Sequence, residues 1–150
     1  MKIAIIYNQN KLSGKLTKLF TGSYAYHIGF LDEESDTFYD MHLLVRKISW
    51  KAKKYKDYTL HACELTVDDC EKYLKQDSLH IRYGVLDYVL FALRPVYHLF
   101  GKSTRNAEGW ICSEMVNQWL WRKSGNKATP FHLDDKPPSP ADFERWLRAH

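Results

Sequence analysis

The feature that most constrains the fold is the uneven distribution of strand and helix patterns along the chain. Runs of β-branched, aromatic and other apolar residues, which are typical of strands, occupy positions 2–7, 24–31, 37–45 and 58–65. The runs at 24–31 and 37–45 flank an acidic turn and predict a hairpin. Helical patterns dominate the second half of the chain. Strands that come early and helices that come late predict an α+β fold.

Local capping signals mark where the helices begin. Ser13 precedes a short pattern, Thr66 and Asp69 resemble a capping box, and Ser139 stands before a first-turn proline. We expect helices over residues 14–20, 67–76, 83–100, 112–124 and 140–149. The long helix over residues 83–100 should be bent or broken near Pro95.

Length and composition favour one folded domain over residues 1–150. The chain has 150 residues, 45% of them hydrophobic, and it contains no internal repeat or composition shift that would mark a boundary. A net charge of +4 permits an anionic partner without requiring one. The odd number of cysteines argues against a disulfide framework and favours reduced thiols. The N-terminal apolar run is too short for a signal peptide, so we expect a cytoplasmic protein.

The best candidate for a membrane span is residues 85–100. This stretch is short, and it contains Asp87, Arg94, Pro95 and His98. A span needs about 20 mostly apolar residues. We therefore expect a buried, kinked helix and no transmembrane segment.

Cys112 lies where a loop rich in Gly, Ser and Asn, residues 101–109, runs into a helical pattern. Free backbone N–H groups and the positive end of the helix dipole meet at such a position. That setting lowers the pKa of a thiol and favours the nucleophilic thiolate. The same N–H groups can bind an oxyanion. The alternative is that Cys112 is a small buried hydrophobe, as many free cysteines are.

A cysteine nucleophile needs a base, and the base needs a group that orients it. Among seven histidines, His27 is the most suggestive, because it lies mid-strand and Gly29 beside it would allow backbone or substrate to approach closely. Asp40 and His42 are two residues apart on the paired strand, so either could accept the ring N–H of His27. Ser113 is a weaker nucleophile candidate, because no Gly-x-Ser-x-Gly elbow surrounds it. The alternative to a catalytic role is that His27 is a half-buried structural histidine and that Asp40 and His42 are a polar pair that faces solvent.

Two other patterns could indicate a binding site, and we favour neither. His61 and Cys63 share a strand face, but no second pair has the spacing of a zinc site, so we expect no metal and no cofactor. The lysine-rich stretch 47–56 is typical of a solvated loop. Trp50 and Tyr55 within it keep nucleic-acid binding open as an alternative that we do not favour.

The order of these motifs resembles that of a known family. Residues 21–30 (TGSYAYHIGF) and 38–41 (FYDM) resemble the first half of the circularly permuted NlpC-like cysteine peptidases. These are papain-like folds in which the histidine strand precedes the cysteine helix. Residues 83–88 (YGVLDY), 110–116 (WICSEMV) and 139–143 (SPADF) are similar to the family's ending, so the resemblance covers nearly the whole chain.

The resemblance implies a catalytic triad and a fold. It implies Cys112 as nucleophile, His27 as general base and Asp40 as the third member, where relatives carry a polar residue, often Glu or His. His42 is the alternative third member. The implied fold is a permuted papain-like (NlpC-type) α+β fold, with a small antiparallel sheet packed against helices that include the nucleophile helix.

Three further residues are candidates for oxyanion or substrate contacts, namely Tyr24, Tyr26 and Ser113. Tyr26 departs from the family pattern, because we expect a small residue such as Ser at its place beside the histidine.

The family acts on peptidoglycan amides, on other peptides and on lipid acyl groups. We expect a cysteine hydrolase that cleaves an amide bond in a peptide or peptidoglycan fragment through a thioester on Cys112. One alternative is an acyltransferase or thioesterase that acts on lipid acyl groups or an acylated small molecule, which an apolar groove formed by residues 85–100 would favour. Another is an inactive binding module, which a large separation of His27 from Cys112 would favour. The sequence does not predict the oligomeric state.

Overall fold

The computed structural model describes residues 1–9, 15, 18–19, 21–42, 44–78, 111–133 and 137–149. The strands are β1 (Lys2–Tyr7), β2 (Ala25–Asp32), β3 (Thr37–Met41), β4 (Val45–Ser49) and β5 (Tyr58–Ala62). The helices are α2 (Trp50–Lys53), α3 (Val67–Asp77), α5 (Cys112–Ser124) and α6 (Pro140–Ala149), with a 3₁₀ turn η1 (Gly125–Lys127) after α5. This arrangement of described elements confirms the predicted α+β class.

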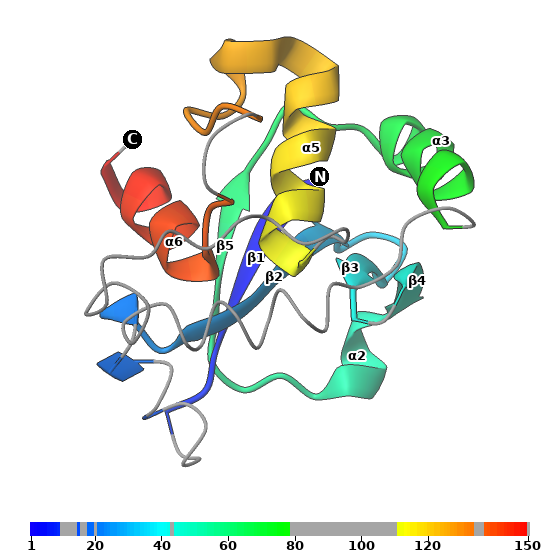
Figure 1. Cartoon of the computed structure of the whole chain (residues 1–150). Helices are drawn as coiled ribbons and strands as arrows, with labels where there is room; N and C mark the ends of the chain where they lie inside the picture. The colour runs from blue at the N-terminus through cyan, green and yellow to red at the C-terminus, as the bar shows by residue number, and fades with distance from the viewer. Residues whose placement is uncertain are drawn as a thin grey trace.

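The five strands form one antiparallel sheet in the order β4-β3-β2-β1-β5. Helix α5 lies across one face of this sheet, where it contacts β2 and β3, and α6 lies beside it and contacts β2 (Figure 1). The pairing of β2 with β3 spans only Phe30 to Asp32 on β2 and Thr37 to Tyr39 on β3. The remaining residues of β2 and β3 therefore lie beyond their paired region.

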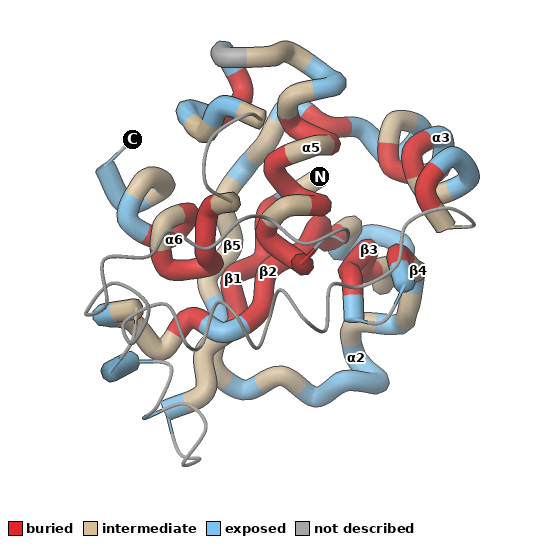
Figure 2. Tube along the Cα trace, in the orientation of Figure 1, coloured by how far each residue is buried: buried red, intermediate tan, exposed pale blue. Residues whose placement is uncertain are grey.

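Alternating side chains give the sheet two apolar faces. The face toward α5 buries Ile3, Ile5 and Phe30 against Trp119, whose ring stacks on Phe30 at 5.7 Å between centroids. Most of α5 and the strands beneath it are buried (Figure 2). The opposite face carries a second cluster of Ala4, Ile6, Leu31 and Phe38, with the partly buried Ile48, Trp50, Tyr55 and Leu60 packed against it.

The helix boundaries that local signals predicted are confirmed for three helices. Thr66 Oγ1 accepts a hydrogen bond from Asp69 N–H at the start of α3, and Ser139 Oγ accepts one from Asp142 N–H at the start of α6. Helix α5 begins at Cys112 and ends before Gly125, whose φ of 57° suits a residue without a side chain. Each of these signals acts within one helical turn, so the sequence alone is sufficient to locate it.

Two predictions in the middle of the chain are wrong in detail. The strand expected over 37–45 is two strands, because β3 ends at Met41 and the chain turns back as β4, which pairs with β3 from Val45 to Ser49. The lysine-rich stretch expected to be a loop contains the short helix α2, which Ser49 caps through a hydrogen bond from Ala52 N–H. The expected segments 14–20, 83–100 and 101–109 lie largely or wholly outside the described residues.

Gly29 lies where β3 passes very close to β2. A Cβ atom at this position would lie 2.5 Å from the Tyr39 carbonyl oxygen and 2.7 Å from the Phe38 ring. From the sequence, either backbone or substrate could approach this glycine. The structure shows that backbone and a core ring do so.

We expect Gly29→Ala to lower the free energy of unfolding by about 2–4 kcal/mol, because neither the carbonyl nor the packed ring can move away cheaply. Urea denaturation of wild type and variant measures this difference. Gly125→Ala is the control, since a Cβ there has no neighbour within 4 Å and meets only the strain of its positive φ. Equal losses in the two variants would contradict the close approach at Gly29.

Within the described residues, no helix combines the length and the apolar character that a membrane span requires.

Candidate active site

A β-bulge in β2 sets the direction of His27. Ile6 of β1 pairs with His27, but the next residue, Tyr7, pairs with Ala25, so Tyr26 is an extra residue on β2. Bulges re-aim neighbouring side chains and are common next to active sites. Here Ala25 packs into the core under α5, whereas the His27 ring contacts Phe38, which belongs to the cluster on the opposite face.

His27, Asp40 and Arg46 form a hydrogen-bonded row across β2, β3 and β4. His27 Nε2 lies 2.9 Å from Asp40 Oδ2. Arg46 donates from Nε to Asp40 Oδ1 at 2.8 Å and from Nη2 to Asp40 Oδ2 at 3.2 Å. Asp40 is fully buried and pairs directly with Arg46 in the register of β3 and β4. Such a two-pronged contact fixes a carboxylate more firmly than a single hydrogen bond.

The environment of Asp40 keeps its carboxyl group ionised. Burial alone would raise the pKa of Asp40, but hydrogen bonds and positive charge from His27 and Arg46 lower it below its usual value. An ionised Asp40 can only accept, so His27 Nε2 must carry the proton of their hydrogen bond. The other ring nitrogen of His27, Nδ1, is then the one that remains for a nucleophile.

Cys112 is the candidate nucleophile that interacts with the His27 ring. It is the first residue of α5, and the end of α5 that carries it lies over β2 next to β3 (Figure 1). Burial alone would lower the pKa of His27, but the negative charge of Cys112, hydrogen bonds with Asp40 and Cys112, and the charge of Asp40 raise it to about 9. Cys112 and His27 are 6% and 9% exposed, so a small opening to solvent remains at each. A thiol beside an imidazole that a carboxylate holds is the arrangement of a candidate nucleophile with its base.

The backbone at the start of α5 supplies hydrogen-bond donors. The residue before the helix, Ile111, has no side-chain oxygen and makes no capping hydrogen bond. Glu114 instead accepts a hydrogen bond from Ile111 N–H at 2.8 Å. The first-turn amides of α5, including that of Cys112, thus have no N-cap side chain bound to them in the described part of the chain, and amides at a helix start can donate to an oxyanion.

We expect the His27 ring to titrate with a midpoint near pH 9, because Cys112 and Asp40 stabilise its protonated form. The sign follows from the raised pKa: the imidazolium persists through neutral pH and loses its proton only as the pH rises through about 9. NMR of ring resonances measures the midpoint, and Cys112→Ala should lower it. His61 is the internal control, since burial lowers its pKa below 6.5. A His27 midpoint at or below 6.5 in the wild type would contradict the pair.

The structure distinguishes between the two predicted partners of His27. His42 follows the end of β3 and is exposed, whereas Asp40 bonds to the ring. The prediction that both side chains share one strand face fails because the chain leaves the strand after Met41.

The three residues predicted to contact an oxyanion or substrate have different surroundings. Tyr26 is 40% exposed, and its ring stacks against His27 at 6.2 Å between centroids. Tyr24 is partly buried, and the ammonium of Lys18 lies over its ring at 4.6 Å from the centroid. Ser113 is fully buried, and its Oγ has no hydrogen-bond partner in the described part of the chain. Of these three residues, Tyr26 is the one that the described structure places both in solvent and in contact with His27.

Sequence reasoning did not place Arg46 or Tyr55 beside His27. Arg46 escaped notice because residues 37–45 read as one strand, and only the turn after Met41 brings Arg46 opposite Asp40. Tyr55 reaches the site through a long-range contact with Phe38, at 6.1 Å between ring centroids. No local pattern in the sequence signals either contact.

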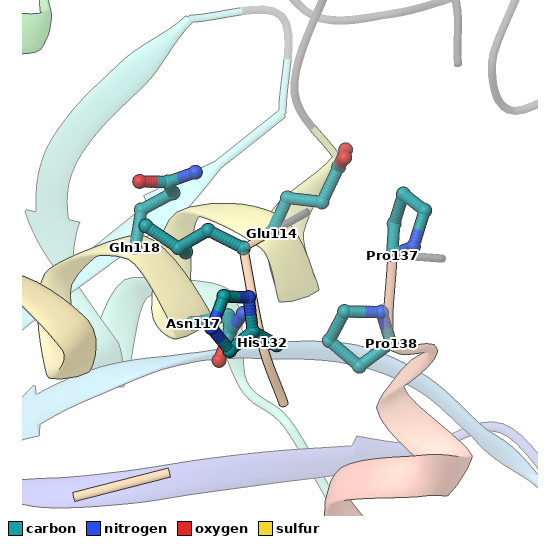
Figure 3. A pocket seen from close by; sticks show the side chains of 7 residues that line it. Glu114, Asn117, Gln118, His132, Pro137 and Pro138 are labelled. Atoms are coloured by element: carbon teal, nitrogen blue, oxygen red, sulfur yellow. The ribbon is translucent and has the colours of Figure 1, made fainter. Parts of the chain in front are cut away.

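A depression beside α5 is separate from these residues. It has a volume of about 250 Å³ including its open mouth, and Glu114, Asn117, Gln118, His132, Leu133, Pro137 and Pro138 line it. Figure 3 shows the prolines facing α5 across it. None of His27, Asp40 and Cys112 lines this depression, so it is not the candidate site.

The described residues contain no group of three or more His, Cys, Asp or Glu side chains that could hold a metal ion. His61 Nε2 lies 3.3 Å from Thr59 Oγ1, in contact with a strand neighbour. Comparison of the chain with protein-family models, with curated proteins and with solved structures gave no match.

Proposed function

We propose that this protein is a cysteine hydrolase of the circularly permuted NlpC-like class, which cleaves an amide bond through a thioester on Cys112. The observation that carries the proposal is the row in which Asp40 Oδ2 holds His27 Nε2 at 2.9 Å while Cys112 interacts with the same ring. Nucleophile, base and orienting group in this relation define a catalytic triad on many unrelated folds.

Acylation follows from the resting ion pair. The Cys112 thiolate attacks the carbonyl carbon, a C–S bond forms, and the carbonyl π electrons move to oxygen, where the Cys112 backbone N–H stabilises the negative charge. The intermediate collapses as the C–N bond breaks. The His27 imidazolium gives its proton to the leaving amine nitrogen, which departs as a neutral amine and leaves a thioester.

Deacylation uses the neutral imidazole that acylation leaves behind. His27 takes a proton from water while the water oxygen attacks the thioester carbon. The C–S bond then breaks, the product leaves as a carboxylic acid, and the thiolate–imidazolium pair is restored. Asp40 stays ionised throughout and keeps the ring in one orientation.

The geometry bears on one of the two alternatives. A binding module without activity predicts that His27 lies far from Cys112, and the interaction between these two side chains runs against it. The segment that would line a lipid groove in an acyltransferase, 85–100, lies outside the described residues. We propose a cytoplasmic location as well, which the three unpaired cysteines support.

The proposal is tested with p-nitrophenyl acetate, an activated acyl donor that needs no knowledge of the natural substrate. Wild-type protein should release a burst of nitrophenol and gain the mass of one acetyl group, which peptide mapping should locate on Cys112. Acetylation should be reversed by water as turnover proceeds. Cys112→Ala should show neither burst nor turnover, whereas Cys63→Ala should behave as wild type. Turnover by Cys112→Ala at the wild-type rate would refute the proposal.

A further inference from the structure

Four lysines gather on one short stretch of the surface, which we call the lysine segment, residues 51–56. Lys51, Lys53, Lys54 and Lys56 are all exposed, and none forms an ion pair among the described residues. The neighbouring Lys47, by contrast, is paired with Glu71.

Two carboxylates adjoin the four lysines of this segment. Asp36 accepts a hydrogen bond from Lys51 N–H, and Asp57 follows the segment in sequence. An excess of positive charge therefore remains on this part of the surface.

The lysine segment has a defined conformation. Lys54 ends α2 with a φ of 51°, a left-handed conformation that is uncommon for a residue with a side chain, and its N–H bonds to Lys51 O at 3.2 Å. The Trp50 ring packs on Phe38 and on Tyr55, each at 4.9 Å between centroids. The aromatic packing fixes the backbone and leaves the ammonium groups in solvent.

The same aromatic cluster connects the lysine segment with the candidate active site. The Phe38 ring contacts both His27 and Tyr55, each at 6.1 Å between centroids. Tyr55 stands between Lys54 and Lys56 in the sequence. Burial raises the pKa of Tyr55 to about 12, and the charges of Asp40 and Cys112 add to the rise, so Tyr55 lies within electrostatic reach of both.

We infer that the lysine segment is a cationic subsite of the active site, which binds carboxylates of an acidic peptide while its scissile carbonyl lies at Cys112. The inference rests on the proposed function. Ammonium groups spread over six residues suit a chain-like substrate with several separate carboxylates. A single phosphate is better held by a converging arginine fork, and the nearby Arg46 is already bound to Asp40.

The charge preference is measurable with two small reagents that alkylate the same thiol. Iodoacetate carries a carboxylate and iodoacetamide is neutral, so the ratio of their rate constants at Cys112 reports the local potential. We expect Lys54→Gln/Lys56→Gln to lower this ratio about threefold at low salt, since two positive charges that flank Tyr55 are lost. We also expect the wild-type ratio to fall between about 10 mM and about 0.3 M salt, because salt screens the field.

The matched control is Lys72→Gln/Lys75→Gln, which removes two exposed lysines from α3 and should leave the ratio unchanged. An equal ratio in wild type and both double variants would overturn the subsite while leaving the proposed function intact. Slow reaction of Cys112 with both reagents would overturn the thiolate, and the subsite with it.

A protection experiment tests the kind of anion. A pentaglutamate peptide should slow the alkylation of Cys112 by iodoacetamide in the wild type and in Lys72→Gln/Lys75→Gln, and protect Lys54→Gln/Lys56→Gln much less. Protection by an oligothymidylate or by inorganic phosphate, but not by pentaglutamate, would overturn the assignment to an acidic peptide.

Discussion

His27→Ala is expected to reduce kcat/KM for p-nitrophenyl acetate by about 10³-fold or more, close to the loss in Cys112→Ala. Without the imidazolium, Cys112 loses the group that stabilises its thiolate and the base that activates water in deacylation. The two losses should not add in the double variant, because the residues act as a unit. Steady-state and burst kinetics of the three variants measure this.

His42→Ala is the control for this result. His42 is the other histidine close to Asp40 in sequence, but it is exposed and makes no interaction with the His27 row in the described structure. Its activity should stay within about twofold of wild type, as for surface substitutions away from a site. A large loss in His42→Ala and a small one in His27→Ala would exchange the roles that we assign.

Asp40→Asn is expected to lower kcat/KM by about 10²–10⁴-fold while leaving the Cys112 thiol and the fold in place. The amide removes the negative charge that helps to raise the pKa of His27, so the ring should titrate at lower pH than in wild type. The same change leaves Arg46 without its ionised partner, and we expect a loss of about 1–3 kcal/mol in the free energy of unfolding. NMR titration, kinetics and urea denaturation measure the three effects.

Arg46→Met tests the orientation of the Asp40 carboxylate without removing the charge of that carboxylate. Asp40 keeps its charge and its hydrogen bond to His27 but loses both hydrogen bonds from the guanidinium. The pKa of Asp40 should rise toward its usual value, and the His27 titration should move upward because Arg46 no longer competes for the carboxylate. The opposite shifts of His27 in Asp40→Asn and Arg46→Met identify Arg46 as a positioning residue. Equal downward shifts would contradict this role.

The parts of the fold that the sequence predicts are those fixed by short-range interactions. The start of α5 at Cys112 and the caps of α3 and α6 depend on side chains within one turn of the helix end. The strand patterns also place His27 on β2 and Asp40 on β3 correctly, because a two-residue repeat needs no tertiary information.

The remaining parts depend on contacts between distant segments. The turn after Met41 brings Arg46 opposite Asp40, and the bulge at Tyr26 re-aims His27, but neither leaves a pattern in the sequence. Strand order is also a tertiary property: β1 lies between β2 and β5 because both of its edges are paired. Tyr55 joins the site only through packing on Phe38. The choice between Asp40 and His42 likewise required the structure.

The most direct test of the central claim is the rate at which each cysteine reacts with iodoacetamide at about pH 6, followed by mass spectrometry. Cys63 and Cys70 are internal controls, because burial raises the pKa of both thiols and keeps them neutral. We expect Cys112 to react at least about tenfold faster than either, and we expect His27→Ala to remove this advantage while His42→Ala preserves it. Equal rates at the three cysteines, or a fast Cys112 that does not depend on His27, would contradict it.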